Sequence, residues 1–331
     1  MLQTDKKKAP PVLPPVSPAP HLWKGRATSN MGQSTNNIMG IVLLALLLPT
    51  GASIYYFGYN AMLVIATSII TAVLTEFISR EIRGKAFALD GSAVVTGLLL
   101  ALTLPPTTPI WMVALGSFFA IAIARELFGG LGHNIFNPAL VGRAFMQVSF
   151  PAAMSTWAAP MGFSFDAVTS ASPLSHAFNW RGENIELYKE LLLGNTSGSI
   201  GETMVVTLLA GGILLIVLEI IDWRIPVVYI GTVGLLSFAL GQDAIFHLLS
   251  GGLMLGAFFM ATDYATSPIT RWGRVIFALG AGILTVIIRL YGSMPEGVCF
   301  SILIMNGLTP LIDRYVRPKP YGFRKGIKSE A

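Results

Sequence analysis

Residues 203–221 read TMVVTLLAGGILLIVLEII and contain a single charged residue, Glu219. An α-helix needs about 20 consecutive apolar residues to cross the hydrocarbon core of a bilayer, and this stretch meets that requirement. Comparable stretches recur along the chain, and 53% of its 331 residues are hydrophobic. Only 12% are charged, against about 25% in an ordinary soluble domain. The sequence therefore predicts an all-α, polytopic membrane protein.

Ten membrane spans are predicted from these apolar stretches. They lie near residues 38–58, 61–79, 91–104, 110–128, 136–150, 203–221, 225–241, 244–262, 273–291 and 296–313. The third and the fifth are short and rich in Gly or Pro, which favours broken or re-entrant helices over simple crossings.

Basic residues divide the connections between these spans into two classes. Connections on the side of the N-terminal tail carry Arg residues, whereas the short loops on the other side carry no Lys or Arg. Because cytoplasmic loops are enriched in Lys and Arg, both termini are predicted to be cytoplasmic. The protein is expected in the inner membrane of a bacterial cell. The net charge of +5 then reflects orientation in the lipid bilayer and does not suggest nucleic-acid binding.

The predicted organisation has five parts. They are a proline-rich basic tail (1–37), a first membrane half (38–150), an outer-side loop (151–202), a second membrane half (203–313) and a basic C-terminal tail (314–331).

The two membrane halves show weak internal similarity. GLLLA at 97–101 resembles GLMLG at 252–256, and the segment 137–140 has a rough counterpart at 306–310. Five spans in each half would make the second half inverted relative to the first. Inverted repeats with interrupted helices place a binding site near the middle of the membrane in transporters. We therefore expect two inverted five-helix repeats with a site between them.

The outer loop contains the string DAVTSAS at residues 166–172, followed by Pro173. Small neighbours leave room around its hydroxyl groups, and Pro173 keeps the following chain out of a helix. The same composition is typical of an ordinary surface turn. Two longer segments accompany the string: DGSAVVTGLLLALTLPP at 90–106 and FGGLGHNIFNPALVGRAF at 128–145.

Together these segments resemble the RnfD/NqrB family of membrane flavoproteins, over nearly the whole membrane region. The string resembles the family's flavinylation signature, Asp-x-x-Ser/Thr-Gly-Ala-Thr, whose last residue carries FMN through a phosphoester. The resemblance implies covalent FMN on Ser172. Asp166, Thr169 and Ala171 would complete the signature that a flavin transferase recognises. Ser172 replaces the usual Thr and Ser170 the usual Gly, so Thr169 stays open as an alternative acceptor.

The resemblance implies a redox subunit of an Rnf-type complex. In that family, the assembly moves electrons between ferredoxin and NAD and couples this transfer to Na⁺ or H⁺ movement. Expected partners are other membrane and peripheral subunits, including a second flavin subunit and iron–sulfur subunits. No Gly-x-Gly-x-x-Gly fingerprint opens a βαβ unit, so NAD is expected to bind a partner. The single Cys299 excludes a self-contained, Cys-ligated iron–sulfur centre.

A small-solute transporter or channel is the alternative function. Ten spans, broken helices and inverted repeats are typical of transporters, and the RnfD/NqrB fold is similar to that of urea and ammonium transporters. Because fold does not determine function, the flavin string distinguishes the two hypotheses.

Four polar residues in the membrane halves are candidate site residues. Asn134 and Asn137 would share a helix face, and both helix capping and ligand binding are open for them. The resemblance implies a second, non-covalent flavin (riboflavin) near this segment. Arg143 could contact it or extend to the membrane interface. Asp263, which precedes a Thr- and Pro-containing break, is the candidate acid of an ion pathway.

Other acidic residues near span ends have basic neighbours in the sequence. The expected ion pairs are Glu76 with Arg80, Glu126 with Arg125 and Glu219 with Arg224.

Overall fold

The computed structural model describes residues 35–84, 90–160, 169–170, 185–194, 196–202, 204–292 and 297–316. Over these residues the chain is largely helical, and its strands are two short segments in the outer loop. The predicted all-α class is confirmed. The N-terminal tail and most of the C-terminal tail lie outside the described residues.

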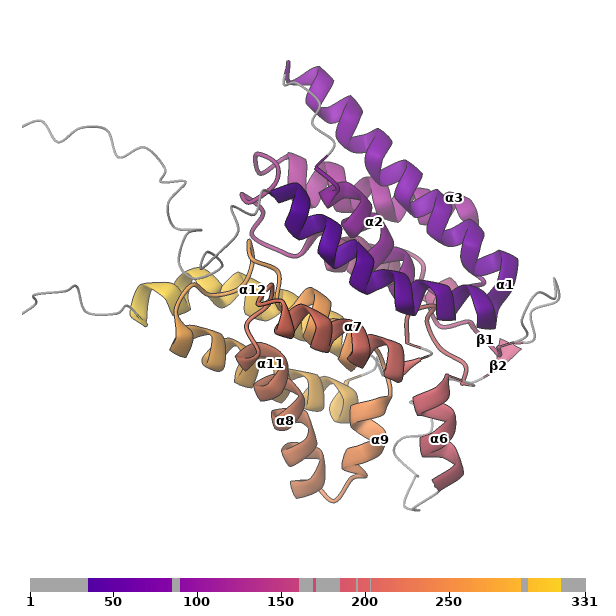
Figure 1. Ribbon diagram of the computed structural model, residues 1–331, viewed down its shortest axis with the longest axis vertical. Helices are drawn as coiled ribbons and strands as arrows, with labels where there is room; N and C mark the ends of the chain where they lie inside the picture. Colours follow the sequence, from indigo (N-terminus) through magenta and orange to yellow (C-terminus); the bar gives the residue numbers. More distant parts are fainter. Residues whose placement is uncertain are drawn as a thin grey trace, which may run out of the picture.

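The first two predicted spans form helix α1 (Thr35–Ile82), which is broken at Gly58. Gly58 has φ 57° and ψ −135°, a conformation that residues with a Cβ rarely adopt. The chain turns sharply there, and the indigo and purple arms of α1 run back from the bend in Figure 1. The predicted spans 38–58 and 61–79 thus correspond to the two arms of α1. The chain bends at Gly58, next to the gap between these spans.

Short helices make up the rest of the first half. They are α2 (Ser92–Thr103), α3 (Ile110–Phe118), the π-helical segment η2 (Phe119–Glu126), α4 (Pro138–Ser149) and α5 (Pro151–Met154). Helices α2 and α4 have 12 residues each. At 1.5 Å per residue that length is about 18 Å, well below the roughly 30 Å of a bilayer core. The third and fifth predicted spans are therefore broken helices, as expected.

The second half contains seven helical segments within the described residues. They are α7 (Val205–Val217), α8 (Arg224–Ala239), α9 (Ala244–Leu249), α10 (Leu253–Leu255), the π-helical η4 (Gly256–Met260), α11 (Arg271–Tyr291) and α12 (Val298–Tyr315). Helix α7 ends earlier than the predicted span because Glu219 adopts a positive φ of 55°, which turns the chain.

The predicted continuous span at 244–262 is wrong. The segment is divided between α9, α10 and η4, because Gly251 and Gly252 adopt positive φ values of 71° and 65°. The buried Arg289 of α11 donates to the carbonyl oxygens of His247 (2.6 Å), Ser250 (2.9 Å) and Gly251 (3.1 Å). A helix end is costly in an apolar environment unless its backbone groups find partners. A single guanidinium on a neighbouring helix supplies them here.

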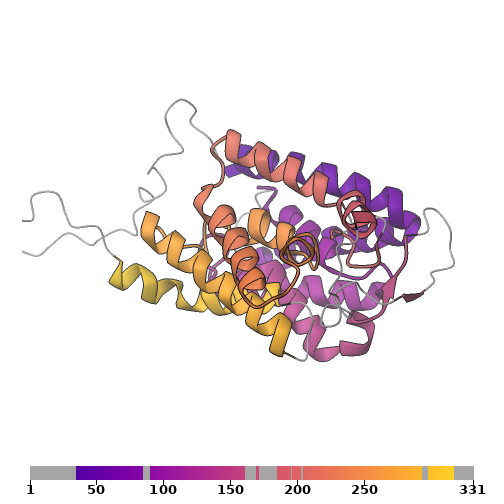
Figure 2. The same ribbon diagram turned by 90° about the horizontal axis from the view of Figure 1, so that it is seen from below.

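The two halves pack against each other around one core. Helix α7 runs along α1 in both views (Figures 1 and 2), and α12 contacts α4 and η4. A single cluster of buried apolar side chains includes residues from both halves. The inverted relation of the halves stays a prediction, whereas their shared core is a feature of the structure.

Two helices among the described residues are long and apolar enough to cross a membrane, Thr35–Ile82 and Arg271–Tyr291. Three shorter helices, α2, α7 and α8, are also apolar. Large apolar side chains remain exposed, among them Leu47 of α1, Leu235 of α8 and Trp272 of α11. Extensive exposed apolar surface marks contact with lipid or with another protein.

The described parts of the outer loop are docked on the helices. Strand β1 (Trp157–Ala158) pairs antiparallel with β2 (Thr169–Ser170), and Ala158 also bridges to Gly198. Helix α6 (Ile185–Leu193) follows. The Tyr188 hydroxyl of α6 donates to the Asp243 carboxylate, which in turn caps α9 through the N–H of Phe246 at 3.1 Å.

Close packing of α1 on α2 gives a stability prediction. A Cβ added to Gly97 of α2 would lie 2.9 Å from the Ser68 carbonyl oxygen and 3.0 Å from the Ala72 Cβ, both on α1. The G97A protein should therefore lose about 1–3 kcal/mol of stability, seen as a lower melting temperature in detergent. The matched control is G51A, since nothing lies within 4 Å of the equivalent position at Gly51. Equal melting temperatures for the two variants would contradict the packing described.

Candidate functional site

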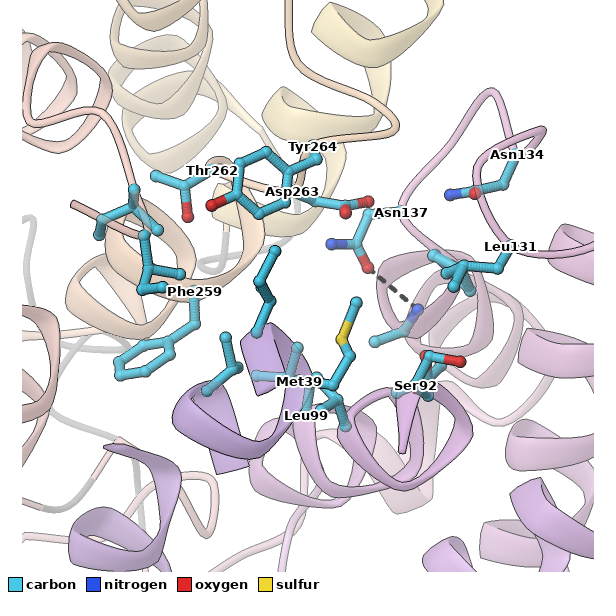
Figure 3. Close-up of a pocket in the computed structure, with 18 of the residues that line it drawn as sticks. Met39, Ser92, Leu99, Leu131, Asn134, Asn137, Phe259, Thr262, Asp263 and Tyr264 are labelled. Atoms are coloured by element: carbon cyan, nitrogen blue, oxygen red, sulfur yellow. Dashed lines mark hydrogen bonds between the residues drawn. The ribbon is translucent and has the colours of Figure 1, made fainter. Parts of the chain in front are cut away.

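A cavity of about 90 Å³ lies where the broken helices meet. Residues from both halves of the chain line it. They include Met39, Val42, Ser92, Val95, Leu99, Arg125, Leu131, Asn134, Asn137, Leu215, Ile220, Phe258, Phe259, Thr262, Asp263 and Tyr264. Figure 3 shows Asp263, Asn137 and Asn134 along one side, and Phe259, Met39 and Leu99 along another. The cavity thus has apolar walls and one polar side.

Asn137 is the residue that builds the start of α4. Its Oδ1 accepts hydrogen bonds from the N–H groups of Ala139 (3.0 Å) and Leu140 (3.3 Å), while Pro138 occupies the first helical position. This is the expected chemistry of an N-cap. Its Nδ2 also donates to the carbonyl oxygen of Met260 at 3.1 Å. Asn137 therefore caps helix α4 in the first membrane half and binds the end of η4 in the second.

Asn306 of α12 completes this junction. With its amide oriented to satisfy both groups, its oxygen accepts from the Asn137 N–H at 3.0 Å. Its nitrogen donates to the Ile302 carbonyl at 3.3 Å. The two Asn-containing segments, which are similar in sequence, are thus in direct contact.

Asn134 and Asp263 lie on the polar side of the cavity. Asn134 is buried, and its Nδ2 donates to the Phe136 carbonyl at 3.1 Å. The Asp263 carboxylate accepts a hydrogen bond from the Thr266 hydroxyl at 3.2 Å. Three of the four polar candidates, Asn134, Asn137 and Asp263, are therefore brought together in one cavity.

Arg143 lies elsewhere. It is buried in α4 and donates to the carbonyl oxygen of Thr103, the last residue of α2. It is absent from the residues that line the cavity. Extension to the membrane interface, one of the two alternatives for Arg143, is not seen, because the guanidinium partners a buried helix end. Contact with a flavin stays a prediction.

Sequence reasoning missed Arg125 as a site residue and expected it to pair with Glu126. Arg125 is 1% exposed, lies in η2 and lines the cavity. Its Nη2 donates to Glu76 Oε1 at 2.7 Å, and it also forms the expected ion pair with Glu126, with 3.7 Å between Nε and Oε1. The available signal was a charged pair, Arg125-Glu126, inside an otherwise apolar stretch.

Arg125 belongs to a cluster of ionised side chains around the end of α1. Arg80 Nη2 is 2.5 Å from Glu76 Oε1, as predicted, and 3.3 Å from Asp90 Oδ2. Arg83 forms an ion pair with Glu126. With Arg125, the cluster contains three guanidinium groups and three carboxylates, so its charges balance. Such buried groups are tolerated when they are paired and hydrogen-bonded.

Of the three expected ion pairs, that of Glu219 with Arg224 is not observed among the described residues. Arg224 Nη1 lies 3.0 Å from Asp222 Oδ2, which Arg274 approaches at 2.6 Å. The positive φ of Glu219 turns the chain between the two residues.

Asp90 connects this cluster to the start of α2. Its Oδ1 accepts hydrogen bonds from the Ser92 N–H at 3.0 Å and from the Ser92 hydroxyl. Burial alone would raise the pKa of the Asp90 carboxyl. The Ser92 hydrogen bonds and the charges of Arg125 and Arg80 outweigh it, so the pKa lies below its ordinary value.

The predicted flavin string is only partly described. Thr169 lies in β2, opposite Ala158. Asp166, Ala171 and Ser172 lie outside the described residues, so their predicted roles stay predictions. Further along the same segment, Tyr56 Oη donates to the Leu193 carbonyl at 2.6 Å and so ties the end of α6 to α1.

The chain is similar to a known family and to several of its members. The model of the NQR2, RnfD, RnfE family matches residues 17–322. The D subunit of a proton-translocating ferredoxin:NAD(+) oxidoreductase complex from Clostridium ljungdahlii is 48% identical, covering 94% of this chain and 96% of the relative. Its Na(+)-translocating counterpart from Acetobacterium woodii is 45% identical, covering 96% and 97%. The D subunit of an ion-translocating oxidoreductase complex from Stutzerimonas stutzeri is 40% identical, covering 87% and 92%.

The junction at Asn137 gives the second prediction. The N137A protein loses the cap of α4 and leaves the Met260 carbonyl without its amide donor, so stability should fall by about 1–2 kcal/mol or more. N137S keeps a capping oxygen and loses the amide donor without adding a buried charge. Thermal unfolding in detergent should rank wild type above N137S and N137S above N137A. A ranking with N137A at wild-type stability would contradict the junction.

Proposed function

The chain belongs to the NQR2, RnfD, RnfE family, and we propose that it is the D subunit of an ion-translocating ferredoxin:NAD oxidoreductase complex. The observation that carries the proposal is identity of 45–48% over at least 94% of the chain to two proteins named as such subunits. A third relative, 40% identical over 87% of the chain, is named as the D subunit of an ion-translocating oxidoreductase complex. The other membrane and peripheral subunits, with their flavin and iron–sulfur centres, would be its partners.

The coupling ion is Na⁺ or H⁺. The two relatives at 48% and 45% identity are named for different ions, a proton and Na⁺ respectively. Overall similarity therefore does not discriminate between them. Asp263, a carboxylate on the cavity wall beside a helix break, remains the candidate acid on the ion pathway.

The first cofactor of the proposal is FMN attached through its phosphate to Ser172, on the outer side of the inner membrane. Its support is the sequence string and the position of Thr169-Ser170 in strand β2, paired with β1. A phosphoester needs a hydroxyl that a flavin transferase can reach, and the string supplies hydroxyl residues at and directly after β2. Both termini would then lie in the cytoplasm.

The second cofactor of the proposal is a non-covalent flavin in the cavity. A flavin ring has an apolar benzenoid end and a pyrimidine end rich in hydrogen-bonding atoms, and the cavity has apolar walls with one polar side. Asn134 and Asn137 would hold the pyrimidine end. The neighbouring ionic cluster is balanced, and Asp263 adds a further carboxylate, so a phosphate group would be unfavourable there. An uncharged riboflavin is therefore proposed here rather than FMN, and because the cavity of about 90 Å³ is smaller than a flavin, its walls would have to move apart to admit the ring.

The protein's contribution would be position and electrostatics. A bound flavin supplies the capacity to accept and donate electrons. Leu99, Phe258 and Phe259 would exclude water from the ring, and the asparagine amides would fix its orientation. Asp263 could hold a proton or cation near the ring and so connect charge movement to electron transfer.

A transporter or channel for small solutes is the second candidate. The observation that favours it is the meeting of several helix breaks at one cavity between the two halves. Such breaks line the substrate sites of many transporters. Identity to oxidoreductase subunits over nearly the whole chain outweighs this argument.

Flavin attachment gives the third prediction. A covalently bound flavin survives denaturation, so the wild-type chain should fluoresce under ultraviolet light in a denaturing gel. S172A should lose this fluorescence, whereas T169A should keep it.

Two results would contradict this assignment in different ways. Fluorescence that persists in S172A and disappears in T169A would move the acceptor to Thr169. A dark wild-type band, isolated from cells that contain the transferase, would remove the covalent flavin and favour the transporter.

A further inference from the structure

An arginine and an aromatic residue are adjacent in the sequence at three helix ends of the second half. The pairs are Trp223-Arg224 at the start of α8, Arg271-Trp272 at the start of α11 and Arg314-Tyr315 at the end of α12. The three aromatic side chains are between 53% and 77% exposed. Exposed aromatic and basic residues at the ends of membrane helices are typical of the level of the lipid headgroups. We therefore expect these ends at a membrane surface.

The three helix ends converge in the fold. Helix α11 packs against both α8 and α12 (Figure 1). Arg274, in the first turn of α11, lies 2.6 Å from Oδ2 of Asp222, two residues before the start of α8. Asp313, in the last turn of α12, accepts a hydrogen bond at 3.1 Å from the N–H of Ile269, just before α11 begins. The arginines of the three ends are therefore held at one place in the fold.

Two of these guanidinium groups are fixed by a single carboxylate. Arg224 Nη1 and Arg274 Nη1 bind the same oxygen, Oδ2 of Asp222, at 3.0 and 2.6 Å. Arg224 also lies over the Trp223 ring, with 5.4 Å between Cζ and the ring centroid. Both arginine side chains remain partly exposed. Arginine has five N–H donors in a rigid fork, so each can bind a phosphate oxygen in addition to Asp222.

Positive charge is in excess at this end. Two arginines share Asp222, while the Asp313 carboxylate binds a backbone N–H group. Arg271 and Arg314 are exposed, and neither forms an ion pair with a described residue; the third acidic residue, Glu219, is exposed and pairs with none of the four arginines. The sequence that follows α12 adds five basic residues and one acidic residue. In the ionic cluster of the first half, by contrast, three guanidinium groups meet three carboxylates.

Apolar side chains continue from this end along the outer surface of the same helices. Val227 of α8, Ile276 of α11 and Leu311 of α12 lie three to five residues from the arginine at their helix end, and all three are exposed. A cationic surface therefore adjoins an apolar one. A soluble anion would use only the cationic surface, whereas an anionic phospholipid would use both.

We propose that the converging ends of α8, α11 and α12 form a binding site for the headgroup of an anionic phospholipid. The fixed pair, Arg224 and Arg274, donates hydrogen bonds to the phosphate, and Arg271 and Arg314 add positive charge around it. The acyl chains lie against the exposed apolar side chains. The site depends on the membrane location of the chain and on no flavin, so it goes beyond the redox function proposed above.

The test uses the purified, detergent-solubilised protein with the subunits that copurify with it, titrated with phosphatidylglycerol or with phosphatidylcholine. R271Q removes one exposed charge, and R271Q/R314Q removes two. K189Q is the matched control for R271Q, because Lys189 is an exposed basic residue of α6, outside this site. A second experiment crosslinks phosphatidylglycerol through a photoactivatable headgroup and identifies the labelled peptides by mass spectrometry.

Phosphatidylglycerol should raise the melting temperature of the wild type, and phosphatidylcholine should not. The apparent affinity for phosphatidylglycerol should fall about fivefold in R271Q and about 25-fold in R271Q/R314Q, because each basic residue near an anionic surface contributes a factor of about five. K189Q should keep the wild-type affinity. Photolabel on the wild type should be found in peptides that contain residues 222–224 or 271–274.

Several results would overturn the proposal. One is wild-type affinity in R271Q/R314Q, and another is photolabel that is absent from this end. Equal stabilisation by phosphatidylcholine would indicate a general effect of lipid, and equal stabilisation by inorganic phosphate would indicate a free anion. Crosslinks from this end to a copurifying subunit in place of lipid would assign the surface to a protein partner. If R271Q/R314Q does not assemble, R271Q decides: reduced affinity supports the site, and unchanged affinity overturns it.

Discussion

Backbone groups at helix breaks must find partners inside the protein, and the fold depends on how this chain supplies them. Hydrocarbon offers no hydrogen bonds, so every interrupted helix end carries a cost of several kcal/mol per unsatisfied group. The side chain of Asn137 caps the start of α4, and Arg289 binds three carbonyls at the break between α9 and α10. Arg143 binds the carbonyl at the end of α2. Three polar side chains thereby make three breaks possible.

The break that Asn137 caps lies at the cavity, whereas the breaks bound by Arg143 and Arg289 lie outside its lining. Uninterrupted helices would fill the space between the two halves with side chains, as in an ordinary bundle core. Here α2, α4 and η4 begin or end near the same point, and the chain around Glu219 turns away after α7. The polar groups left at this point, Asn134, Asn137 and Asp263, face a common volume with Arg125. The features that make the fold irregular also make the site.

Much of this architecture could be predicted from the sequence. Apolar length identified most helices, and the Gly and Pro content of 91–104 and 136–150 correctly indicated broken ones. Asn137-Pro138 was recognisable as a cap because capping is local chemistry. The division of 244–262 was not predictable in the same way, because it requires Arg289, which lies some 40 residues further along the chain. Arg125 was missed for a related reason, since its place in the cavity lining depends on how η2 packs against residues far away in the sequence. The covalent acceptor could be named only from the motif.

Pairing of the short strands links three parts of the 151–202 segment that are far apart in the sequence. Ala158 pairs with Thr169 in β2 and also bridges to Gly198. Three stretches of backbone therefore share one residue as a common partner. A substitution in β1 that distorts its backbone would disturb all three together, which makes the two residues of β1 the point on which the order of this segment depends.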